Sequence, residues 1–570
     1  MRIPVSISFE TFRIRLIDLI IFFLIVGIFS LIVYIASQWG APYERSLEIE
    51  LGLQNIFGYA VQSIVRIFFA YLLSLIFSIW YGYAASRSKI RERIMIPLLD
   101  ILQSIPVLSF LPGVVLAMIA IFPEKRIGLE IACVLLIFTG QVWNMTFSFY
   151  HSINTVPREM VEVVKVFKWN KFSKFLRLDL PFSAIGLVWN SMMSVAGGWF
   201  FLMACEMFVL EGKDFRLPGL GSYIQTAANK GDIVNVIYGL GTMIALIILI
   251  DFIIWRPIIV WSQKFRLGSI PPEEERESFV YNLFVSSVFL RRIGDLVSNV
   301  INKIERLYYK EFPLVRSPFF KVVSKGVSIS FLFIIMLAIM WALFKAFYLV
   351  SSISLVDIFL IIKASFYSLL RVFAALLIAL LWTLPVGVFI GLNPRAAKYL
   401  QGIVQIAASV PATAIFPVII LFIIRFGGGL DIGAILLMLL GTQWYLLFNI
   451  IAGASAIPKD LIEISRAYKI KGLKRWKTLI LPSIFPYLVN GLITASGGAW
   501  NATIVSEYVS FGGGIIKTVG LGALISSSSA SGDFRFLLLS TCFMSLIVVS
   551  INRLVWKRLF ILAKTKYVLE

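Results

Sequence analysis

Long apolar stretches separated by short polar connections run along almost the whole chain. Each stretch has about 20 residues or more, which is enough for an α-helix to cross a hydrocarbon core about 30 Å thick. The predicted spans are residues 16–36, 57–85, 96–122, 128–153, 181–210, 233–260, 326–350, 358–391, 399–424, 430–455, 483–510 and 534–561. The pattern therefore predicts an all-α polytopic membrane protein of about twelve spans, six in each half.

The two halves repeat one another. Matched residues lie 305 positions apart up to the connection between the third and fourth spans, where a four-residue length difference reduces the offset to 301. The pairs include Ser63/Ser368, Arg66/Arg371, Pro106/Pro411, Pro112/Pro417, Trp199/Trp500, Glu206/Glu507 and the Gly-Leu-Gly segments 219–221 and 520–522. Chance does not hold a register over so many such positions, so the chain is a tandem duplication. With six spans each, the halves have the same orientation around a pseudo-two-fold axis along the membrane normal.

The repeat divides the chain into a first half at residues 1–262, a polar linker at 263–323 and a second half at 324–570. The linker opens with Pro271-Pro272 and a charged run. Farther along, Val297, Ile301, Ile304 and Tyr308 recur at helical spacing. This spacing predicts an amphipathic helix on the membrane surface or on a partner. No function beyond tethering follows from it.

Composition agrees with a chain that has the bilayer as its solvent. Hydrophobic residues make up 59% of the sequence and charged residues 15%, with a mean hydropathy of +0.90, whereas soluble domains carry about a quarter charged residues. The three cysteines fall in predicted spans, and His151 is the single histidine. A disulfide framework and a Cys/His zinc site are therefore not expected.

The net charge of +21 follows membrane topology and does not require nucleic acid as a partner. The second span is followed by four bases, Arg87, Lys89, Arg91 and Arg93. The charged residues after the first span are one base, Arg45, and three acids, Glu44, Glu48 and Glu50. The positive-inside rule then places the N-terminus in the cytoplasm, and twelve spans bring the C-terminus to the same side. The first apolar run has full span length, so it is interpreted as a transmembrane helix and not as a cleaved signal peptide.

One cytoplasmic segment joins the fourth and fifth spans of each half and has the same order of residues in both. A proline, Pro157 or Pro458, is followed by acidic residues, then by bases, and then by a Leu-Pro pair. The acidic residues are Glu159, Glu162, Asp460 and Glu463, and the closing pairs are Leu180-Pro181 and Leu481-Pro482. Acid near the start of a helix and base near its end favour a short helix across the cytoplasmic face, and the closing proline marks re-entry into the membrane. Ordinary basic loops that only obey the positive-inside rule are the simpler alternative.

At these residues both halves resemble the permease subunits of bacterial and archaeal ABC importers, whose loop carries a Glu-Ala-Ala stretch, a downstream glycine and a terminal Leu-Pro. The resemblance implies coupling helices that dock on ATPase subunits, with Glu162 and Glu463 in the glutamate position. This sequence departs from the pattern, because Val163-Val164 and Ile464-Ser465 replace the alanines and Lys168 and Lys469 replace the glycine. Only the second half has a nearby glycine, Gly472.

The resemblance also implies two copies of an ABC ATPase, an extracytoplasmic solute-binding protein and a prokaryotic plasma membrane. The nearest approach to a phosphate loop in this chain, residues 512–518, lacks the glycine before lysine. The chain is therefore expected to have no catalytic residues, no metal and no cofactor of its own, with ATP and magnesium held by the separate ATPase.

A second set of residues gives candidates for the solute pathway or its gate. In the fifth and eleventh spans they are Gly197, Gly198, Trp199 and Glu206, and Gly497, Gly498, Trp500, Asn501 and Glu507. Glycines permit close helix approach, and an intramembrane carboxylate needs a partner or water. Helix packing with a glutamate near the outer interface is an equal alternative. Arg66 and Arg371 attract an anion or stabilise the pathway in one interpretation and snorkel to the interface in the other.

The region around Glu206 and Glu507 resembles the nitrate, sulfonate, taurine and bicarbonate branch of these importers, including its duplicated anion-transport permeases. That resemblance implies an oxyanion-type solute. The paired prolines Pro106/Pro112 and Pro411/Pro417 are expected to break the third and ninth spans. A proton-coupled secondary transporter of 6+6 architecture is the alternative from another class, and a membrane scaffold is a third. The few carboxylates in the spans favour the importer.

Overall fold

The computed structural model describes residues 48–123, 125–210, 213–265, 278–309, 354–425, 429–511 and 514–566, with isolated positions between 19 and 39 and between 336 and 344. Most of the first and seventh predicted spans, and the start of the linker, lie outside these residues. The chain forms two compact units. The smaller contains residues 1–39, 151–189 and 249–332, and the larger contains 40–150, 190–248 and 333–570. The boundary cuts through the first repeat, so the units are not the two repeats.

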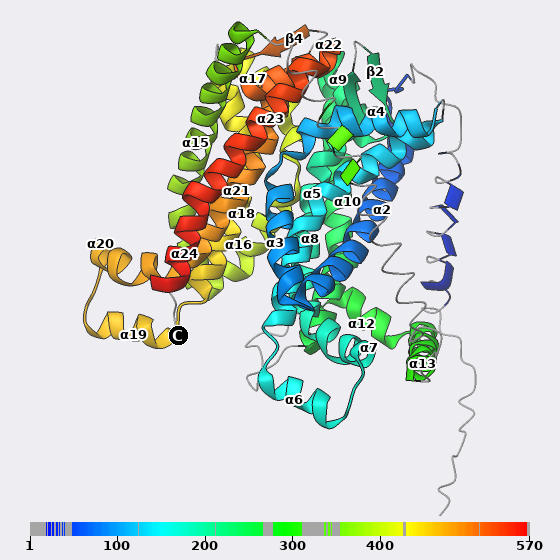
Figure 1. The fold of residues 1–570 in the computed structure, drawn as a ribbon, viewed down its shortest axis with the longest axis vertical. Helices are drawn as coiled ribbons and strands as arrows, with labels where there is room; N and C mark the ends of the chain where they lie inside the picture. The colour runs from blue at the N-terminus through cyan, green and yellow to red at the C-terminus, as the bar shows by residue number, and fades with distance from the viewer. Residues whose placement is uncertain are drawn as a thin grey trace, which may run out of the picture. The chain divides into compact units, whose positions relative to one another are not determined.

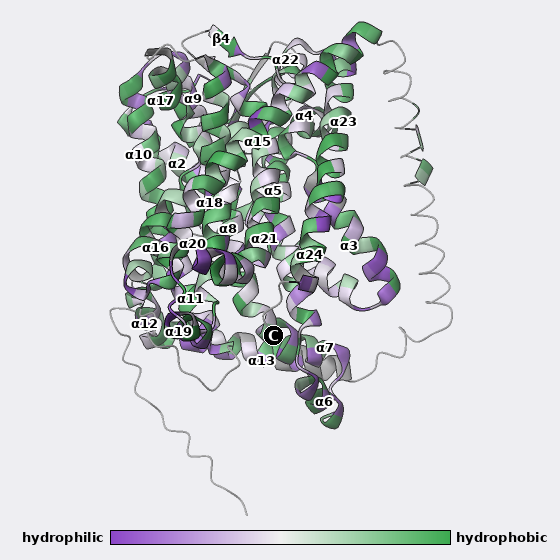
Figure 2. Cartoon of the chain, turned by 90° about the vertical axis from the view of Figure 1, so that its left-hand side faces the viewer, coloured by the Kyte–Doolittle hydropathy of each residue, from purple (hydrophilic) through white to green (hydrophobic). Residues whose placement is uncertain are grey.

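Eight helices in the described residues are long and apolar enough to cross a membrane, four in each repeat. In the first repeat their principal segments are α2 (Leu53–Ser86), α5 (Arg126–Asn154), α8 (Leu180–Glu206) and α10 (Ile233–Ile250). In the second they are α15 (Leu355–Leu392), α18 (Leu430–Ser455), α21 (Leu481–Ser506) and α23 (Phe534–Ile551). Figure 2 shows hydrophobic colour along these helices. The predicted multi-pass helical architecture is therefore confirmed, while the count of twelve stays a prediction.

The third and ninth predicted spans are broken helices. In the first repeat α3 (Lys89–Ser104) is followed by the 3-10 turn η1 (Val107–Phe110) and α4 (Leu111–Ile121). In the second, α16 (Pro394–Ser409) is followed by α17 (Ala412–Arg425). The breaks fall at Pro106 and Pro411, as predicted. The other proline of each pair does not break a helix, because Pro112 lies in the first turn of α4, where no helical N–H bond is lost, and Pro417 is accommodated inside α17.

Two short antiparallel hairpins follow the fifth and eleventh spans. They are β1 (Met207–Leu210) with β2 (Lys213–Arg216), and β3 (Tyr508–Phe511) with β4 (Gly514–Lys517). The prediction that these spans stay helical through residue 210 and residue 510 is wrong at their ends. The first strand of each hairpin, β1 or β3, is rich in apolar and aromatic residues, so hydropathy alone cannot separate it from the last turn of a helix. Each hairpin leads into a short helix, α9 (Leu220–Asn229) or α22 (Leu521–Ser531).

The connection between the fourth and fifth spans contains short helices in both repeats. These are α6 (Arg158–Val166) and α7 (Lys171–Lys174) in the first, and α19 (Lys459–Ala467) and α20 (Gly472–Arg475) in the second. In the larger unit, α19 and α20 lie at the opposite end from β4 and α22 (Figure 1). We call these the loop end and the hairpin end of that unit. Hydrophilic colour is concentrated in α6, α19 and α20 (Figure 2).

Four π-helical turns also obey the repeat. The turns η2 (Phe175–Asp179) and η3 (Asp251–Trp255) recur 301 residues later as η6 (Trp476–Ile480) and η7 (Asn552–Trp556). They lead into α8, α11 (Arg256–Ser262), α21 and α24 (Lys557–Lys566), respectively. Such turns interrupt the regular ladder and are typical of functional or bent positions in a helix. Their duplication shows that the repeat extends to local backbone geometry.

The linker, residues 263–323, opens with the 3-10 turn η4 (Gln263–Phe265) and contains α12 (Phe279–Ser286) and α13 (Val288–Tyr309). The helix predicted around Ile301 is therefore present. Ile301 is partly exposed, as are Leu296 and Val300. The side chains of Val297, Ile304 and Tyr308 lie outside the described part of the chain.

Candidate functional site

The predicted loop helices begin at equivalent residues in the two repeats. Pro157 and Pro458 occupy the N-cap positions of α6 and α19. Glu159 and Asp460 lie in the first turn, where negative charge favours the helix dipole. Glu162 and Glu463 are exposed on the same helices.

Both loop helices also expose large apolar side chains at equivalent positions. Val163 and Phe167 are 47% and 66% exposed in the first repeat. Ile464 and Tyr468, 301 residues later, are 51% and 78% exposed. In the sequence, residues 163–164 and 464–465 are only departures from an alanine pair, and this exposed surface is not predicted. A signal was present, because apolar residues recur within an otherwise charged segment of both repeats.

The loop helices end in a left-handed residue in both repeats. Lys168 has φ 49° and Lys469 has φ 52°, and they are the only non-glycine residues with positive φ in the described part of the chain. These are the two positions at which the resemblance calls for glycine, which is the residue that adopts this conformation without strain. Gly472 also has positive φ, at 54°. Both lysines thus adopt a conformation that glycine would adopt without strain.

The closing Leu-Pro pairs lie within continuous helices. Residues Lys171–Glu206 and Gly472–Ser506 each form one apolar helical run. Pro181 and Pro482 therefore do not start a new helix, and the expectation that they mark re-entry into the membrane stays a prediction. Each proline comes directly after a π-helical turn and Leu180 or Leu481, where the altered ladder tolerates a residue without an N–H.

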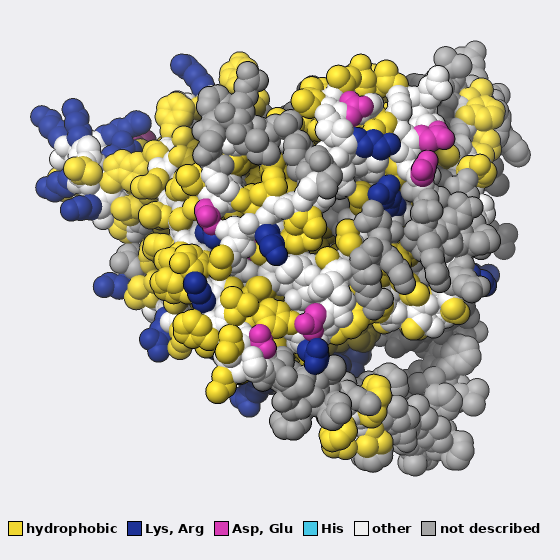
Figure 3. Space-filling view, turned by 90° about the horizontal axis from the view of Figure 1, so that it is seen from above, with side chains coloured by type: hydrophobic (Ala, Val, Ile, Leu, Met, Phe, Trp, Pro, Cys, Tyr) yellow, Lys and Arg dark blue, Asp and Glu magenta, His cyan; other side chains and the backbone are white. Residues whose placement is uncertain are grey.

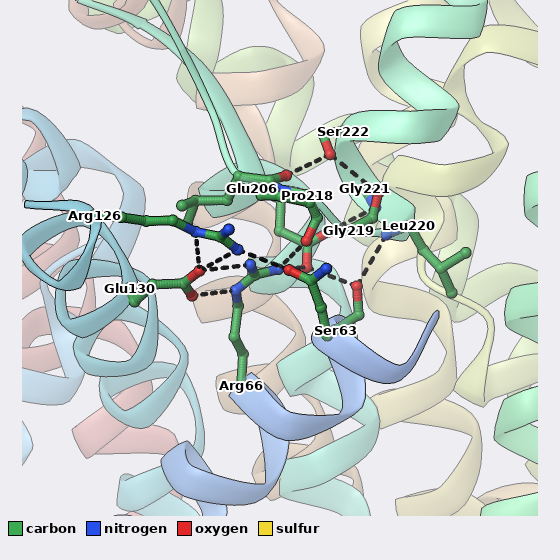
Figure 4. A network of polar contacts seen from close by, with 12 residues as sticks. Ser63, Arg66, Arg126, Glu130, Glu206, Pro218, Gly219, Leu220, Gly221 and Ser222 are labelled. Carbon is green, nitrogen blue, oxygen red and sulfur yellow. Dashed lines mark hydrogen bonds and ion pairs between the residues drawn. The ribbon is translucent and has the colours of Figure 1, made fainter. Parts of the chain in front are cut away.

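A buried ion cluster joins three spans of the first repeat (Figure 4). Arg66 of α2 binds Glu130 of α5 through Nε and Nη2 at 2.5 and 2.9 Å, and binds Glu206 of α8 through Nη1 at 2.6 Å. Arg126 pairs with Glu130 at 2.8 Å. The side chains of Arg66, Glu130 and Glu206 are 0% exposed. Burial of these charges is tolerated because each finds a partner of opposite sign. We call Ser63, Arg66, Arg126, Glu130 and Glu206 the first arginine cluster.

The first arginine cluster also holds the backbone that follows the hairpin. Arg66 Nη1 donates to the carbonyl of Pro218, and the Ser63 hydroxyl donates to Glu206 and accepts from the Leu220 N–H. Glu206 accepts from the Gly221 N–H at 2.6 Å. A Cβ at Gly219 would overlap the Glu206 carboxylate. The Gly-Leu-Gly segment is thus explained by the close approach of backbone to a buried carboxylate.

The second repeat contains an equivalent cluster of Ser368, Arg371, Asp431, Glu507 and Thr518, which we call the second arginine cluster. Arg371 binds Glu507 at 2.9 Å and the carbonyl of Val519 at 2.9 Å, and Ser368 bridges Glu507 and the Leu521 N–H. Asp431 stands in the place of Glu130 and accepts from Arg371 at 2.5 Å, but its side chain is 70% exposed. Thr518 adds hydroxyl contacts to Arg371 and Asp431.

These contacts decide one of the alternatives for the arginines. Arg66 and Arg371 are buried, so the interpretation that they snorkel to the interface is wrong. The sequence pattern identifies Arg66, Arg371, Glu206 and Glu507 separately and does not pair them. Glu130 and Asp431 are not among the predicted residues, although both are carboxylates inside predicted spans at the 301-residue offset.

The other predicted pathway residues, except Gly497, lie at helix contacts. Trp199 and Trp500 are buried, and Gly198 packs on the side chain of Gln141. Gly197 approaches Tyr445 of the other repeat, and Gly498 approaches Thr442 and Tyr445, while a Cβ at Gly497 would meet no atom within 4 Å. Asn501 accepts from the Val107 N–H at 2.7 Å and so joins α21 to the break before η1.

A cavity of about 420 Å³ lies between residues of the two repeats inside the larger unit. Every first-repeat residue that lines it has an equivalent second-repeat residue that lines it too, so the cavity lies on the internal pseudo-two-fold axis. These pairs are Leu108/Thr413, Leu111/Phe416, Pro112/Pro417, Met203/Ile504, Ala204/Val505, Met207/Tyr508, Phe208/Val509, Val209/Ser510, Gln225/Ser526 and Asn229/Ala530. None of the predicted pathway residues is among these lining residues.

Hydrogen bonds join the repeats beside this cavity. Gln225 Nε2 of α9 donates to the Ser510 carbonyl at 3.2 Å, and the Ser510 hydroxyl donates to Asn229 Oδ1 at 3.2 Å. On the face seen in Figure 3, Lys and Arg side chains gather at the left edge, and the other charged side chains lie among apolar and uncharged ones. The cavity itself is lined by amides, hydroxyls and apolar groups, without lysine, arginine, histidine, aspartate or glutamate.

Similarity to known proteins agrees with this duplicated architecture. The family described as "Binding-protein-dependent transport system inner membrane component" matches twice, at residues 74–255 and 383–556. Among curated relatives, the nitrate import permease protein NrtB of Leptolyngbya laminosa is 27% identical over 188 residues, which are 33% of this chain and 64% of the relative.

The taurine transport system permease protein TauC of Escherichia coli is 31% identical over 170 residues, or 29% of this chain and 56% of the relative. The bicarbonate transport system permease protein CmpB of Synechococcus elongatus is 26% identical over 196 residues, or 34% and 67%. The chain spans just under two thirds of the nitrate permeases it matches. The two family matches together cover more than half of the sequence, and the chain therefore belongs to the family of binding-protein-dependent transport system inner membrane components.

Proposed function

We propose that this chain contains both permease halves of an ATP-binding-cassette importer, with residues 1–262 and 324–570 as the halves and 263–323 as their linker. It forms the translocation pathway for a small solute, in the class of the nitrate, sulfonate, taurine and bicarbonate named for its relatives. It is not itself an enzyme. Two copies of a separate ATPase hydrolyse ATP with magnesium, and an extracytoplasmic solute-binding protein delivers the solute.

The observation that carries this proposal is the repeated loop helix with its exposed apolar pair. An apolar pair that remains in water on a charged helix is unfavourable unless a partner covers it. The same pair appears 301 residues apart, at Val163/Phe167 and Ile464/Tyr468, so two identical partners fit better than one. We assign α6 and α19 as the coupling helices, with Glu162 and Glu463 beside the docking surface, and the loop end as cytoplasmic.

On this topology both termini are cytoplasmic and the hairpin end faces the solute-binding protein. The arginine clusters then hold the hairpins and the Gly-Leu-Gly segments against the outer ends of the spans. Arg66, Arg371, Glu206 and Glu507 therefore support the walls of the pathway, and Trp199 and Trp500 pack its helices. The cavity on the pseudo-two-fold axis lies in the pathway itself.

The test is ATP-dependent uptake by the chain assembled with its ATPase in proteoliposomes. Phe167→Asp and Tyr468→Asp are expected to abolish co-purification of the ATPase and ATP-dependent uptake, because a buried unpaired charge at a docking centre costs several kcal/mol. Phe167→Leu and Tyr468→Phe are the matched controls and should retain both. Full uptake by the two aspartate variants would contradict the proposal.

A proton-coupled secondary transporter remains the alternative, and energy dependence separates the two. An importer takes up solute with ATP in the presence of a protonophore, whereas a proton-coupled carrier stops. The buried carboxylates Glu206 and Glu507 are each held by an arginine. A proton relay needs carboxylates that exchange protons, so these ion pairs favour the importer.

A further inference from the structure

The two walls of the cavity on the pseudo-two-fold axis differ in polarity. At four of the equivalent pairs one repeat presents a neutral polar side chain and the other an apolar one. The polar members are Thr413 opposite Leu108, Tyr508 opposite Met207, Ser510 opposite Val209, and Asn229 opposite Ala530. Three of the four come from the second repeat. The cavity is thus lined by equivalent residues of the two repeats, but one of its sides is more polar and the other more apolar.

Hydrogen-bond accounting shows which polar groups are left over. The Asn229 Oδ1 already accepts from the Ser510 hydroxyl at 3.2 Å and from Gln225 Nε2 at 3.4 Å, whereas no acceptor for its Nδ2 is present in the described residues. The Thr413 hydroxyl is buried and has no hydrogen-bond partner within the described part of the chain. A buried polar group without a partner is costly and is normally satisfied. Asn229 Nδ2 and the Thr413 hydroxyl are therefore two donors available to a ligand group that accepts hydrogen bonds.

The size and the remaining lining argue for a ligand larger than an inorganic oxyanion. The volume of about 420 Å³ falls within the range of sites for small organic molecules, about 300 to 1,000 Å³. A water molecule occupies about 30 Å³ of liquid, so an ion of a few atoms would fill a small part of it. Most of the lining is aliphatic or aromatic, with Phe208 and Phe416 as its phenylalanines. Without a cation in the lining, a bare inorganic anion would exchange its hydration for apolar surface with nothing to offset the cost, whereas an organic anion also gains from burial of its apolar body against that surface.

We propose that this cavity binds a small organic solute with an apolar body and one head group that accepts hydrogen bonds, such as a sulfonate. Thr413 and Asn229 donate to the head group, and Phe208 and Phe416 pack on the body. The inference rests on the proposed function, since it takes the cavity as part of the pathway, and it narrows the solute from oxyanions in general to organic ones.

The experiment measures ligand-dependent thermal stabilisation of the purified full chain in lipid nanodiscs by tryptophan fluorescence. Three probes are titrated: hexane-1-sulfonate, hexylammonium with the same body and a donor head group, and nitrate. A ligand that binds only the folded state raises Tm in proportion to its occupancy. Hexane-1-sulfonate is expected to raise Tm with saturation, and hexylammonium and nitrate are expected to leave it unchanged at the same concentrations.

Two variants assign the binding to the cavity. Thr413→Leu and Asn229→Ala each introduce the residue type found at the equivalent position of the other repeat, so both suit a wall of this shape. Each should weaken hexane-1-sulfonate roughly tenfold, the effect of losing one hydrogen bond to a charged group. Thr494→Leu, a helical threonine that does not line the cavity, is the matched control and should bind as the unaltered chain does.

Stabilisation by nitrate without hexane-1-sulfonate, equal stabilisation by hexylammonium, unchanged affinity in both variants, or no stabilisation by any probe would each overturn the inference. None of these results depends on the ATPase. A chain that binds hexane-1-sulfonate but shows no ATP-dependent uptake would refute the importer and leave the cavity assignment standing. A chain that imports nitrate with ATP and does not bind hexane-1-sulfonate would support the importer and refute the cavity assignment.

Discussion

The first and second arginine clusters use the same frame and balance their charges differently. In both, one arginine joins a glutamate, a serine and the backbone of a Gly-Leu-Gly segment. The first cluster buries its other carboxylate, Glu130, and supplies a second cation, Arg126, to neutralise it. The second leaves Asp431 largely in water and has glycine at residue 427, the position equivalent to Arg126.

This difference separates what the fold requires from what each repeat can vary. The serine, arginine, glutamate and glycines fix the hairpin to the spans in both copies, so they form the common frame. The second carboxylate is variable, provided that it is either buried with an extra cation or exposed without one. Both solutions avoid an unbalanced buried charge, which would cost several kcal/mol.

Removal of the variable carboxylate, Glu130 in the first cluster or Asp431 in the second, should have the largest effect and should differ most between the two clusters. Glu130→Ala leaves Arg66 and Arg126 close together and partly unpaired in a buried site, which we expect to destabilise the fold by about 3 to 5 kcal/mol. Asp431→Ala removes a partner that is 70% exposed, and we expect at most about 1 kcal/mol. The measurement is unfolding of the two purified variants in nanodiscs, followed by tryptophan fluorescence.

A third variant tests the charge argument within the first cluster. Arg126→Ala combined with Glu130→Ala leaves Arg66 paired with Glu206, so it should recover part of the stability lost in Glu130→Ala. Equal losses for Glu130→Ala and Asp431→Ala, or no recovery in the double variant, would show that the two clusters are not balanced in the way described.

The glycines of the common frame should respond alike in both repeats, with a smaller effect. A Cβ at Gly219 or Gly520 would overlap the carboxylate of Glu206 or Glu507, and both sites must shift to accept alanine. We expect Gly219→Ala and Gly520→Ala each to cost about 1 to 3 kcal/mol, as overpacked sites do. Gly113→Ala in α4 is the control, because its Cβ would meet no atom within 4 Å. Unchanged stability in Gly219→Ala or Gly520→Ala would show that the close approach of backbone to carboxylate does not stabilise that cluster.

Sequence reasoning reached the frame only in pieces. The 305- and 301-residue offsets identified Ser63, Arg66, Glu206 and the Gly-Leu-Gly segment as repeated, and apolar length predicted the spans that carry them. It could not join residues about 140 positions apart, because spacing along helices says nothing about which spans are neighbours. Glu130 and Asp431 were available from the same offset, and matched carboxylates opposite a matched arginine would have predicted an ion cluster.

Local backbone geometry was the other limit. Apolar strands such as Met207–Leu210 look like the end of a span, so the hairpins were missed. The π-helical turns have no sequence pattern that hydropathy detects, and they explain why Pro181 and Pro482 continue a helix. The cavity could not be predicted because its lining is mostly apolar residues like those of any span. Only the pairing of equivalent residues from the two repeats in the structure shows that they line one cavity.

At the loop end the two repeats have the same backbone conformation, and the substitutions there have the smallest expected effect on stability. Lys168 and Lys469 both hold a left-handed conformation that costs an L-residue about 1 to 2 kcal/mol, against about 0.5 to 1 kcal/mol of extra chain entropy for glycine. Lys168→Gly and Lys469→Gly should therefore stabilise α6 and α19 by up to about 1 kcal/mol, measured as slower amide hydrogen exchange in each helix. Lys165→Gly, which removes the same charge from a helical position of α6, should speed exchange instead. Faster exchange in either left-handed variant would show that the lysine side chain, and not its backbone strain, governs the end of that loop helix.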